Sequence, residues 1–467
     1  MTWFPGLDWI VPLIVLTVLV FVHELGHYLV ARWNGVRIDV FSIGFGPELF
    51  GWNDRTGTRW KFSAIPLGGY VKMFGDENAA SLPSGNVSEM TEAERRVSFP
   101  HKRLMQRVAI VSAGPIANFI LAIALLTIFI AIHGQDYNPP VVGFVMDKSA
   151  AADAGIKVGD VVVSIDGQPI SSFEDILNIV PLNTGTPLDV VLRRGGETLE
   201  RTITPQITID YDRLGLRYTI ARLGIQPFSP PVVGDVEEKS AAAAAGVKPG
   251  DTILSIDGKP VASYQEYLHF FLSNTTGAPV DLALRRGDQV VKVQMTPTMV
   301  KVKDPGGVER ETPQLDIYGP KGEVIEHGPV GSIWYATVDS WRQTTGTLRT
   351  VGQMLLGRRS ADGLGGILSI GGYLHQAAKD GILSVVRLAA FISLNLGLIN
   401  LFPIPVLDGG WLLFYAAEGI RGKPLGQRAQ EYGFRLGLAL VLMLMIFANW
   451  NDLDRWGIVG FIKRLVT

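Results

Sequence analysis

Two histidines and a glutamate form the motif with the clearest chemical meaning, His23-Glu24-Leu25-Gly26-His27. If the segment is helical, the imidazoles of His23 and His27 lie one turn apart on one face, where both can bind one metal ion. Glu24 then stands where its carboxylate can take a proton from an attacking water molecule. The alternative, polar residues that cap a core helix, is disfavoured because ionisable groups in an apolar span are costly and usually functional.

A catalytic zinc ion needs a third protein ligand and an open position for water. The chain has no cysteine, and none of its other histidines falls in a predicted membrane span. The best polar candidate at membrane depth is Asp408, in the stretch NLGLINLFPIPVLDGG that runs from Asn395 to Gly410. The alternative for Asp408 is a helix-ending turn, because Asp-Gly is a turn signal and the prolines before it break helices.

Membrane spans are the elements that must position these residues. Charged residues make up only 18% of the 467 residues, and the mean hydropathy is +0.24, whereas a soluble domain has about 25% charged residues. A span needs about 20 mostly apolar residues. Four segments approach that length: Trp9 to Ala31, Val108 to Ile132, Leu383 to Pro405 and Gly433 to Trp450.

The positive charges predict how these spans are oriented. Eleven Lys and Arg residues lie between Arg32 and Arg107, and Arg421, Lys423 and Arg428 follow the third span. Both loops are therefore expected in the cytoplasm, and residues 133–381 on the outer side. The net charge of −2 offers no basic surface for nucleic acid, and none is expected as a partner.

The outer stretch repeats itself with an offset of 91 or 92 residues. The paired segments are Lys148-Ser149-Ala150 with Lys239-Ser240-Ala241, AGIKVGD with AGVKPGD, VVVSIDGQPI with TILSIDGKPV, and the two Arg-Arg-Gly turns. These matches predict two copies of one module built from short strands. The modules resemble PDZ domains, which bind peptides by strand addition at an exposed sheet edge.

One segment resembles the loop with which PDZ domains bind a peptide carboxylate. It is Leu223-Gly224-Ile225-Gln226-Pro227, and its counterpart near Leu315 to Tyr318 is a poor match. Which of the two copies the first loop serves depends on circular permutation, and the residues leave that open.

Together these motifs resemble the site-2 protease family of intramembrane zinc metalloproteases, over the whole chain. The shared segments are HELGH, FSIGFGPELF, IPLGGYVKMFGD, SAGPIANF, the tandem PDZ modules and NLGLINLFPIPVLDGG. The resemblance implies one Zn²⁺ ion held by His23, His27 and Asp408, with Glu24 as general base. It also implies that substrate is held by Asn400, Pro403 and Pro405, with Asn395 nearby.

The fold implied is a polytopic α-helical membrane protein with four transmembrane helices, two tandem α+β PDZ domains and a membrane-associated β-hairpin region. The hairpin is expected between Phe41 and Phe74, where an ordinary cytoplasmic hairpin is the alternative. One departure is Trp411, where a histidine is expected after L-D-G-G, and it affects local packing only.

The expected organisation has five parts. They are the first two transmembrane helices with the cytoplasmic β loop (1–135), PDZ domain 1 (136–228), PDZ domain 2 (229–318), a linker (319–382) and the last two transmembrane helices (383–467). Residues 330–356 of the linker have helical spacing, which fits either an interfacial helix on the outer face or a plain linker helix.

The function implied is zinc-dependent intramembrane endopeptidase activity in a bacterial inner membrane, with periplasmic PDZ domains and an active site open toward the cytoplasm. The expected substrates are single-span membrane proteins such as anti-sigma factors, cut after an upstream site-1 protease has acted, and signal-peptide remnants. The PDZ modules would either recruit the trimmed substrate or exclude the untrimmed one. A non-catalytic, membrane-anchored PDZ scaffold is the alternative, and Glu24 argues against it. A transporter that moves protons through the intramembrane His and Asp is a further alternative. The sequence does not support it, because it lacks the inverted repeat of spans expected of such a protein.

Overall fold

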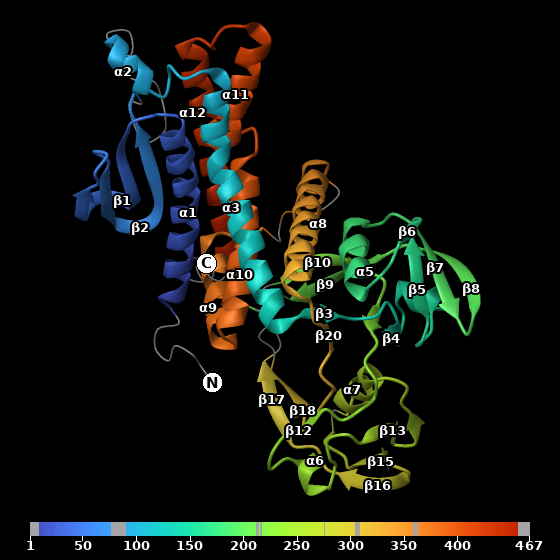
Figure 1. Ribbon diagram of the computed structural model, residues 1–467. Helices are drawn as coiled ribbons and strands as arrows, with labels where there is room; N and C mark the ends of the chain where they lie inside the picture. The colour runs from blue at the N-terminus through green and yellow to red at the C-terminus, as the bar shows by residue number, and fades with distance from the viewer. Residues whose placement is uncertain are drawn as a thin grey trace, which may run out of the picture. The chain divides into compact units, whose positions relative to one another are not determined.

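The computed structural model describes residues 9–75, 90–211, 214, 217–274, 276–303, 309–357, 361 and 364–455. The chain divides into two compact units. The helical unit comprises the residues up to His133, residues 327–348 and the residues from Leu364 onward. The repeat unit comprises residues 134–326 and 349–363, and Figure 1 draws both units.

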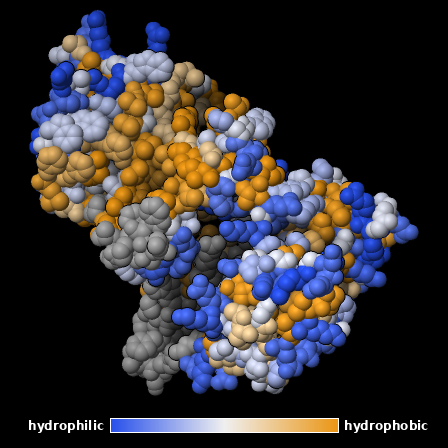
Figure 2. Space-filling model, turned by 60° about the horizontal axis from the view of Figure 1, so that its bottom comes forward, coloured by the Kyte–Doolittle hydropathy of each residue, from blue (hydrophilic) through white to orange (hydrophobic). Residues whose placement is uncertain are grey.

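Among the described residues, four helices are long and apolar enough to cross a membrane. They are α1 (Val11–Trp33), α3 (Leu104–His133), α10 (Ile382–Asn400) and α12 (Gln427–Arg455). They match the four predicted spans, except that the third ends at Asn400, before the prolines, rather than at Pro405. Apolar side chains cover much of the helical unit in Figure 2, while hydrophilic ones predominate on the repeat unit.

Helix α3 packs against both α1 and α10, and small residues allow the close approach. A Cβ atom on Gly26 of α1 would lie 2.4 Å from the Ala113 carbonyl oxygen of α3. A Cβ atom on Gly397 of α10 would lie 3.0 Å from the Pro115 carbonyl oxygen. Glycines at such contacts are typical of membrane helices, because packing rather than hydrophobic burial holds the helices together there.

The remaining elements of the helical unit are shorter or lie outside the spans. They are β1 (Ile38–Asn53), β2 (Arg59–Met73), α2 (Glu92–Val97), α8 (Pro329–Leu355, whose last turns belong to the repeat unit), α9 (Ile367–Asp380) and α11 (Asp408–Arg421). Strands β1 and β2 form an irregular antiparallel hairpin. Phe41 on β1 is fully buried in a core shared with α1 and α3, and its ring stacks on Trp60 of β2 at 4.3 Å. This contact fixes the base of the hairpin against the span that carries the two histidines.

The repeat unit contains the same succession of elements twice. The first copy has β4 (Val142–Val145), α4 (Ala150–Asp153), β5 (Val161–Ile165), β6 (Gln168–Pro169), α5 (Phe173–Ile179), the 3₁₀ turn η2 (Val180–Leu182), β7 (Leu188–Arg194), β8 (Glu197–Ile203), β9 (Gln206–Tyr211), β10 (Arg217–Arg222) and β11 (Ile225–Pro227). The second has β12 (Asp235–Val236), α6 (Ala241–Ala244), β13 (Thr252–Ile256), β14 (Lys259–Pro260), α7 (Tyr264–Leu272), β15 (Val280–Arg286), β16 (Gln289–Met295), β17 (Met299–Lys303), β18 (Glu309–Pro313) and β19 (Ile317–Tyr318). The strand orders β6-β5-β7-β8 and β14-β13-β15-β16 correspond position by position.

Strand pairing assigns the segment Leu223 to Pro227 to the first copy. Strand β11 pairs with β4, and Leu223 is buried in the first hydrophobic core. The equivalent pair in the second copy is β12 with β19. Each copy therefore closes with a strand from its own C-terminal end. Flanking both copies, β3 (Gln135–Tyr137) pairs with β20 (Glu323–Ile325).

An ion pair with a buried aspartate joins two of the segments that recur in each repeat, the A-G-x-K-x-G-D turn and the Arg-Arg-Gly turn. In the second copy, Arg286 donates to both oxygens of Asp251, with Nε to Oδ1 at 2.8 Å and Nη2 to Oδ2 at 2.7 Å. Asp160 and Arg194 form the same bidentate pair in the first copy. Hydrogen bonds from Arg286, opposed by burial and aided by the backbone N–H of Lys248, hold the pKa of the Asp251 carboxyl below its usual range. Such charged bidentate pairs are stronger than neutral hydrogen bonds.

We expect Asp251→Asn to destabilise the second repeat by about 1–3 kcal/mol, because the amide leaves the guanidinium without its charged partner. The measurement is hydrogen exchange of the β13 and β15 amides in the full chain at pH 7. The matched control is Asp288→Asn, at an exposed position in the turn between β15 and β16.

The pH dependence follows from the lowered pKa of Asp251. Its stabilising effect is complete above the unfolded-state pKa of about 3.9 and disappears as the pH falls through the lower folded-state pKa. The parent protein should therefore be more stable than Asp251→Asn above about pH 4, and the difference in stability should disappear only below that pH. Equal protection of the parent and Asp251→Asn at pH 7 would contradict this account.

Candidate active site

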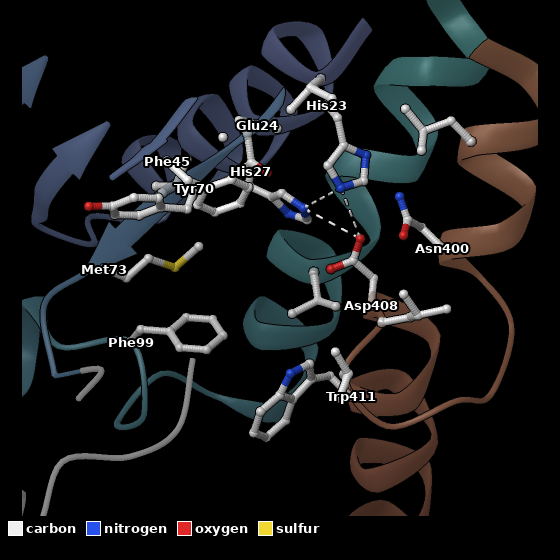
Figure 3. Close-up of a pocket in the computed structure, with 18 residues that line it drawn as sticks. His23, Glu24, His27, Phe45, Tyr70, Met73, Phe99, Asn400, Asp408 and Trp411 are labelled. Atoms are coloured by element: carbon white, nitrogen blue, oxygen red, sulfur yellow. Dashed lines mark hydrogen bonds and ion pairs between the residues drawn. The ribbon is translucent and has the colours of Figure 1, made fainter. Parts of the chain in front are cut away.

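The two motif histidines lie on one face of α1, as their spacing predicts. Each is 8% exposed, and their Nε2 atoms are 3.3 Å apart. Asp408, in the first turn of α11, brings its Oδ2 atom to 3.2 Å from Nε2 of His23 and 3.5 Å from Nε2 of His27. Figure 3 shows the three side chains pointing toward one another. The structure therefore brings together all three predicted ligands, from segments almost 400 residues apart.

Hydrogen bonding decides which nitrogen of His27 faces Asp408 with a lone pair. Its Nδ1 atom is 2.9 Å from the carbonyl oxygen of Ile110, which can only accept, so Nδ1 carries the proton. In the neutral imidazole, Nε2 is then unprotonated. Asp408 Oδ2 is itself buried, and no hydrogen-bond donor for it is found among the described residues. Two imidazole nitrogens and one carboxylate oxygen thus converge at one point.

This arrangement fits a metal cation, and zinc in particular. Ligand atoms about 2.0–2.1 Å from a tetrahedral zinc ion lie about 3.3–3.4 Å from one another. The three separations of 3.2, 3.3 and 3.5 Å agree with that geometry before any adjustment. Two imidazoles and one carboxylate are also a ligand set that leaves a fourth position open for water or substrate, as catalytic zinc sites require.

Helix α3 leaves room for both imidazoles at Gly114. A Cβ atom there would lie 2.2 Å from Nε2 of His27 and 2.8 Å from Cε1 of His23. Any side chain at this position would displace His27 Nε2, so the glycine is required by close approach.

The β hairpin positions Glu24 from the other side of the site. The backbone N–H of Val71 on β2 donates to the Glu24 carboxylate. A Cβ atom on Gly69 would lie 2.7 Å from the Ser42 carbonyl oxygen and 3.4 Å from Cγ of Glu24. The strand therefore runs close beside Glu24, and its backbone contributes to where the carboxylate points.

The loop from α10 to α11 presents Asp408 in a tightly wound conformation. Val406 has φ of 100°, a region that a β-branched residue rarely adopts and that costs on the order of 1–3 kcal/mol. Cβ atoms on Gly409 and Gly410 would lie 2.2 Å from the Phe402 carbonyl oxygen and 2.5 Å from the Ile404 carbonyl oxygen. The G-G pair thus lets the first turn of α11 lie against the end of α10.

A cavity of about 370 Å³ surrounds these groups. It is lined by His23, Glu24, His27 and Asp408, by Gly68 to Val71 and Met73 of β2, and by Val20, Phe45, Phe99, Val111, Leu396, Asn400, Val406, Leu407 and Trp411. Of the predicted substrate-binding residues of this unit, Asn400 lines the cavity, whereas Asn395, Pro403 and Pro405 do not. Asn395 Nδ2 instead donates to the Phe391 carbonyl oxygen at 2.8 Å.

The other predicted binding residues, Leu223, Gly224 and Ile225, lie in the repeat unit. The Leu223 side chain is buried, and its carbonyl oxygen accepts from the Ala151 N–H at 2.9 Å. The Gly224 carbonyl oxygen accepts from the Met146 N–H at 2.8 Å. A cavity of about 310 Å³ lies beside Gly224 and is lined on one side by Lys148.

Several residues of the site carried no role in the sequence reasoning. Gly69, Gly114, Asn118 and Val406 belong to this group, although all four lie in segments that resemble the family. A signal existed for Asn118, since it is a polar residue in the middle of an apolar span. Val406 had none, because its backbone conformation follows from the loop rather than from its side chain.

Comparisons with known proteins identify relatives of this chain. The family described as Peptidase family M50 matches residues 11–444. A "Putative zinc metalloprotease" of Rhizobium meliloti (strain 1021) is 39% identical, over 95% of this chain and 95% of its own length. The "Regulator of sigma-E protease RseP" of Salmonella typhimurium, the protein that the motifs resemble in particular, is 34% identical over 95% of this chain and 97% of its own length. A solved PDZ domain of an SdrC-like protein from Listeria monocytogenes covers 20% of this chain and 88% of its own, at 26% identity and a TM-score of 0.16, and carries no argument.

We expect Gly114→Ala to lower zinc affinity more than tenfold while the fold persists, because the added methyl group must displace His27 Nε2. Bound zinc is measured on the purified full chain against a competing chelator. The matched control is Gly371→Ala in α9, where a Cβ atom would meet nothing within 4 Å. If both alanine variants hold zinc as the parent does, the imidazoles do not bind metal at this place.

Proposed function

Because the chain belongs to peptidase family M50, as its motifs predict, we propose that His23, His27 and Asp408 hold the zinc ion of this site-2-type intramembrane metalloprotease and that Glu24 is its base. The family and the names of the relatives make the chain a zinc-dependent membrane protease rather than a scaffold. The observation that carries the residue assignment is the convergence of two Nε2 atoms and one carboxylate oxygen within 3.2–3.5 Å, inside the cavity that Glu24 also lines.

The chemistry assigned to these residues is hydrolysis of a peptide bond. Zinc supplies Lewis acidity, which polarises the scissile carbonyl and makes water a nucleophile near neutral pH. Glu24, oriented by the Val71 N–H, takes the proton of the attacking water and passes it to the leaving amine. Asn400 lines the same cavity and is placed to hydrogen-bond the substrate backbone.

The hairpin β1–β2 is proposed to lie in the membrane and to align the unwound substrate. A helical substrate must unwind before attack, and its freed backbone groups then need partners. Strand β2 supplies backbone beside the cavity, from Gly68 to Val71. At the far end of β1, Leu49 is 73% and Phe50 60% exposed, which favours contact with lipid over contact with water.

Helix α8 is proposed to lie at the interface of the membrane with water, on the outer (periplasmic) face of the inner membrane. Trp334, Trp341, Leu348 and Leu355 recur every seventh residue and are all exposed, Trp334 and Trp341 at 70% each. Ala336, between them in sequence, is buried in a core with residues of α3 and α10. An apolar stripe with tryptophans on the side away from the core is typical of an interfacial helix, which supports this alternative over a plain linker.

The membrane topology and the substrates are proposals that follow from these features. We place the chain in a bacterial inner membrane, with the repeats in the periplasm and the active site open toward the cytoplasm, on the basis of the loop charges. The names of the sigma-E regulating relatives support single-span substrates such as anti-sigma factors, cut after a site-1 protease. Signal-peptide remnants are a second substrate class of the same shape.

The two repeats are proposed to be PDZ domains that act before the chemical step. In each repeat, a strand from the C-terminal end of that repeat pairs with its first strand: β11 with β4, and β19 with β12. The segments that resemble carboxylate-binding loops therefore lie beside β4 and β12. The poor match of the second carboxylate loop favours exclusion of substrates that still carry an outer domain. The cavity beside Gly224 supports recruitment of a new C-terminus by the first copy instead. We take exclusion as the expected role.

We expect Glu24→Gln to lower proteolysis by about 10²–10⁴-fold, because glutamine has nearly the same shape but accepts no proton at neutral pH. Zinc binding should remain at the parental level, since Glu24 is not a ligand. The measurement is cleavage of a membrane-anchored test substrate, with bound zinc determined on the same sample. Parental cleavage by a zinc-loaded Glu24→Gln variant would exclude Glu24 as the base.

Under exclusion, removal of residues 139–321 should allow cleavage of a substrate that keeps its outer domain. A short Gly-Ser linker in their place retains the β3–β20 pair and so the ends of the module. Cleavage of the trimmed substrate should be unchanged, and Lys148→Glu, which alters the charge beside Gly224, should be nearly silent. Cleavage rates of trimmed and untrimmed substrates are compared in one membrane preparation.

The opposite pattern supports recruitment: the deletion and Lys148→Glu would both slow cleavage of the trimmed substrate. If the deletion variant cleaves the trimmed substrate normally and still rejects the untrimmed one, neither role is correct.

A further inference from the structure

Asn118 is a buried polar side chain on α3 with an incomplete set of hydrogen bonds. It is fully buried, and its Nδ2 atom lies 3.2 Å from Nδ1 of His23. Its Oδ1 atom has no donor within the described part of the chain. An unsatisfied amide oxygen in an apolar span is unfavourable, so its retention calls for an explanation.

The protonation of His23 supplies that explanation. An imidazole that binds a metal through Nε2 carries its proton on Nδ1. A protonated Nδ1 would face the Nδ2 donor of Asn118, and two donors cannot bond each other. A half-turn of the carboxamide about its last torsion, which is nearly free of steric cost, brings Oδ1 to face Nδ1. The same turn gives Oδ1 a donor and moves Nδ2 to the place that Oδ1 leaves.

We propose that Asn118 is a positioning residue that holds His23 for metal binding and changes its hydrogen bond with the state of the site. With metal bound, Oδ1 accepts from the Nδ1–H of His23. Without metal, Nδ2 donates to an unprotonated Nδ1. This inference rests on the proposed metal role of His23. The second histidine lacks this freedom, because its partner is the Ile110 carbonyl oxygen, which accepts in either state.

The frame around Asn118 is suited to this role. Ile110, Gly114 and Asn118 are spaced by four residues and so follow one face of α3. Along this face, the carbonyl oxygen of Ile110 holds His27, Gly114 leaves space for both rings, and Asn118 reaches His23. Ser393 of α10 donates from Oγ to the Asn118 carbonyl oxygen at 2.8 Å, which ties the backbone at this point. The carboxamide is therefore free to turn while its anchor stays fixed.

The test measures zinc affinity of the full-length protein in detergent by competition with a chelator. Asn118→Leu, which has a similar size but no polar atom, should weaken zinc binding by about 10–100-fold. Asn118→Asp keeps an acceptor for Nδ1–H and should stay within about threefold of the parent. Ser393→Ala is the matched control: it removes a buried hydrogen bond to the same residue without touching the imidazole, and zinc affinity should not change.

A spectroscopic readout separates positioning from general packing. With cobalt(II) in place of zinc, Asn118→Leu should shift the visible absorption of the saturated site, whereas Asn118→Asp and Ser393→Ala should not. The proposal is overturned if Asn118→Leu matches the parent in affinity and spectrum, or if Ser393→Ala weakens zinc as strongly. If Asn118→Leu does not fold, loss of zinc from folded Asn118→Asp overturns it and retention supports it. Failure of the metal site itself is recognised separately, because His23→Ala would then bind zinc like the parent.

Discussion

The meeting of two imidazole nitrogens and one carboxylate oxygen in an apolar interior is the interaction on which the helical unit depends. Burying these polar groups close together is unfavourable unless a cation or hydrogen bonds compensate. A cation bound by all three groups would join α1 to α11, which lie far apart in the sequence. Helix α3 makes no direct contribution to the ligand set, yet it orients both rings. The site therefore depends on the packing of three helices and on strand β2, which runs beside Glu24.

The loop between α10 and α11 places Asp408 by means of a restricted backbone conformation. The third span stops at Asn400 because the prolines beyond it cannot continue the helix. The chain then turns back through Val406 in a strained conformation, and Asp408 restarts a helix beside the end of the last one. Helix α12 packs directly against this turn, since a Cβ atom on Gly437 would lie 1.6 Å from the Pro405 carbonyl oxygen. Strain held by surrounding contacts is common at active sites and keeps a functional side chain in one place.

The sequence predicts the proposed ligands because their chemistry is local or restricted by composition. The spacing of His23 and His27 predicts that they share one helix face, and Asp408 is the best polar candidate at membrane depth. Asn395 shows the limit: its motif is similar to that of the family, but its amide bonds its own helix and does not face the cavity. Asn118 and Gly114 could not be assigned roles, because which face of α3 meets α1 is decided by packing between helices. The ownership of the loop at Leu223 likewise depends on long-range strand pairing, which periodicity cannot reveal.

The repeat unit is built as an insertion whose two ends meet. Strand β3 begins directly after α3, and β20 ends four residues before α8 begins, yet the two pair residue by residue from Gln135 with Ile325 to Tyr137 with Glu323. Everything between them is closed within itself, since each copy has its own hydrophobic core. An insertion whose ends are hydrogen-bonded places little demand on the elements that flank it. Among the described residues, the hydrophobic cores of the repeats therefore share no member with the cores that hold α1, α3 and α10 around the site.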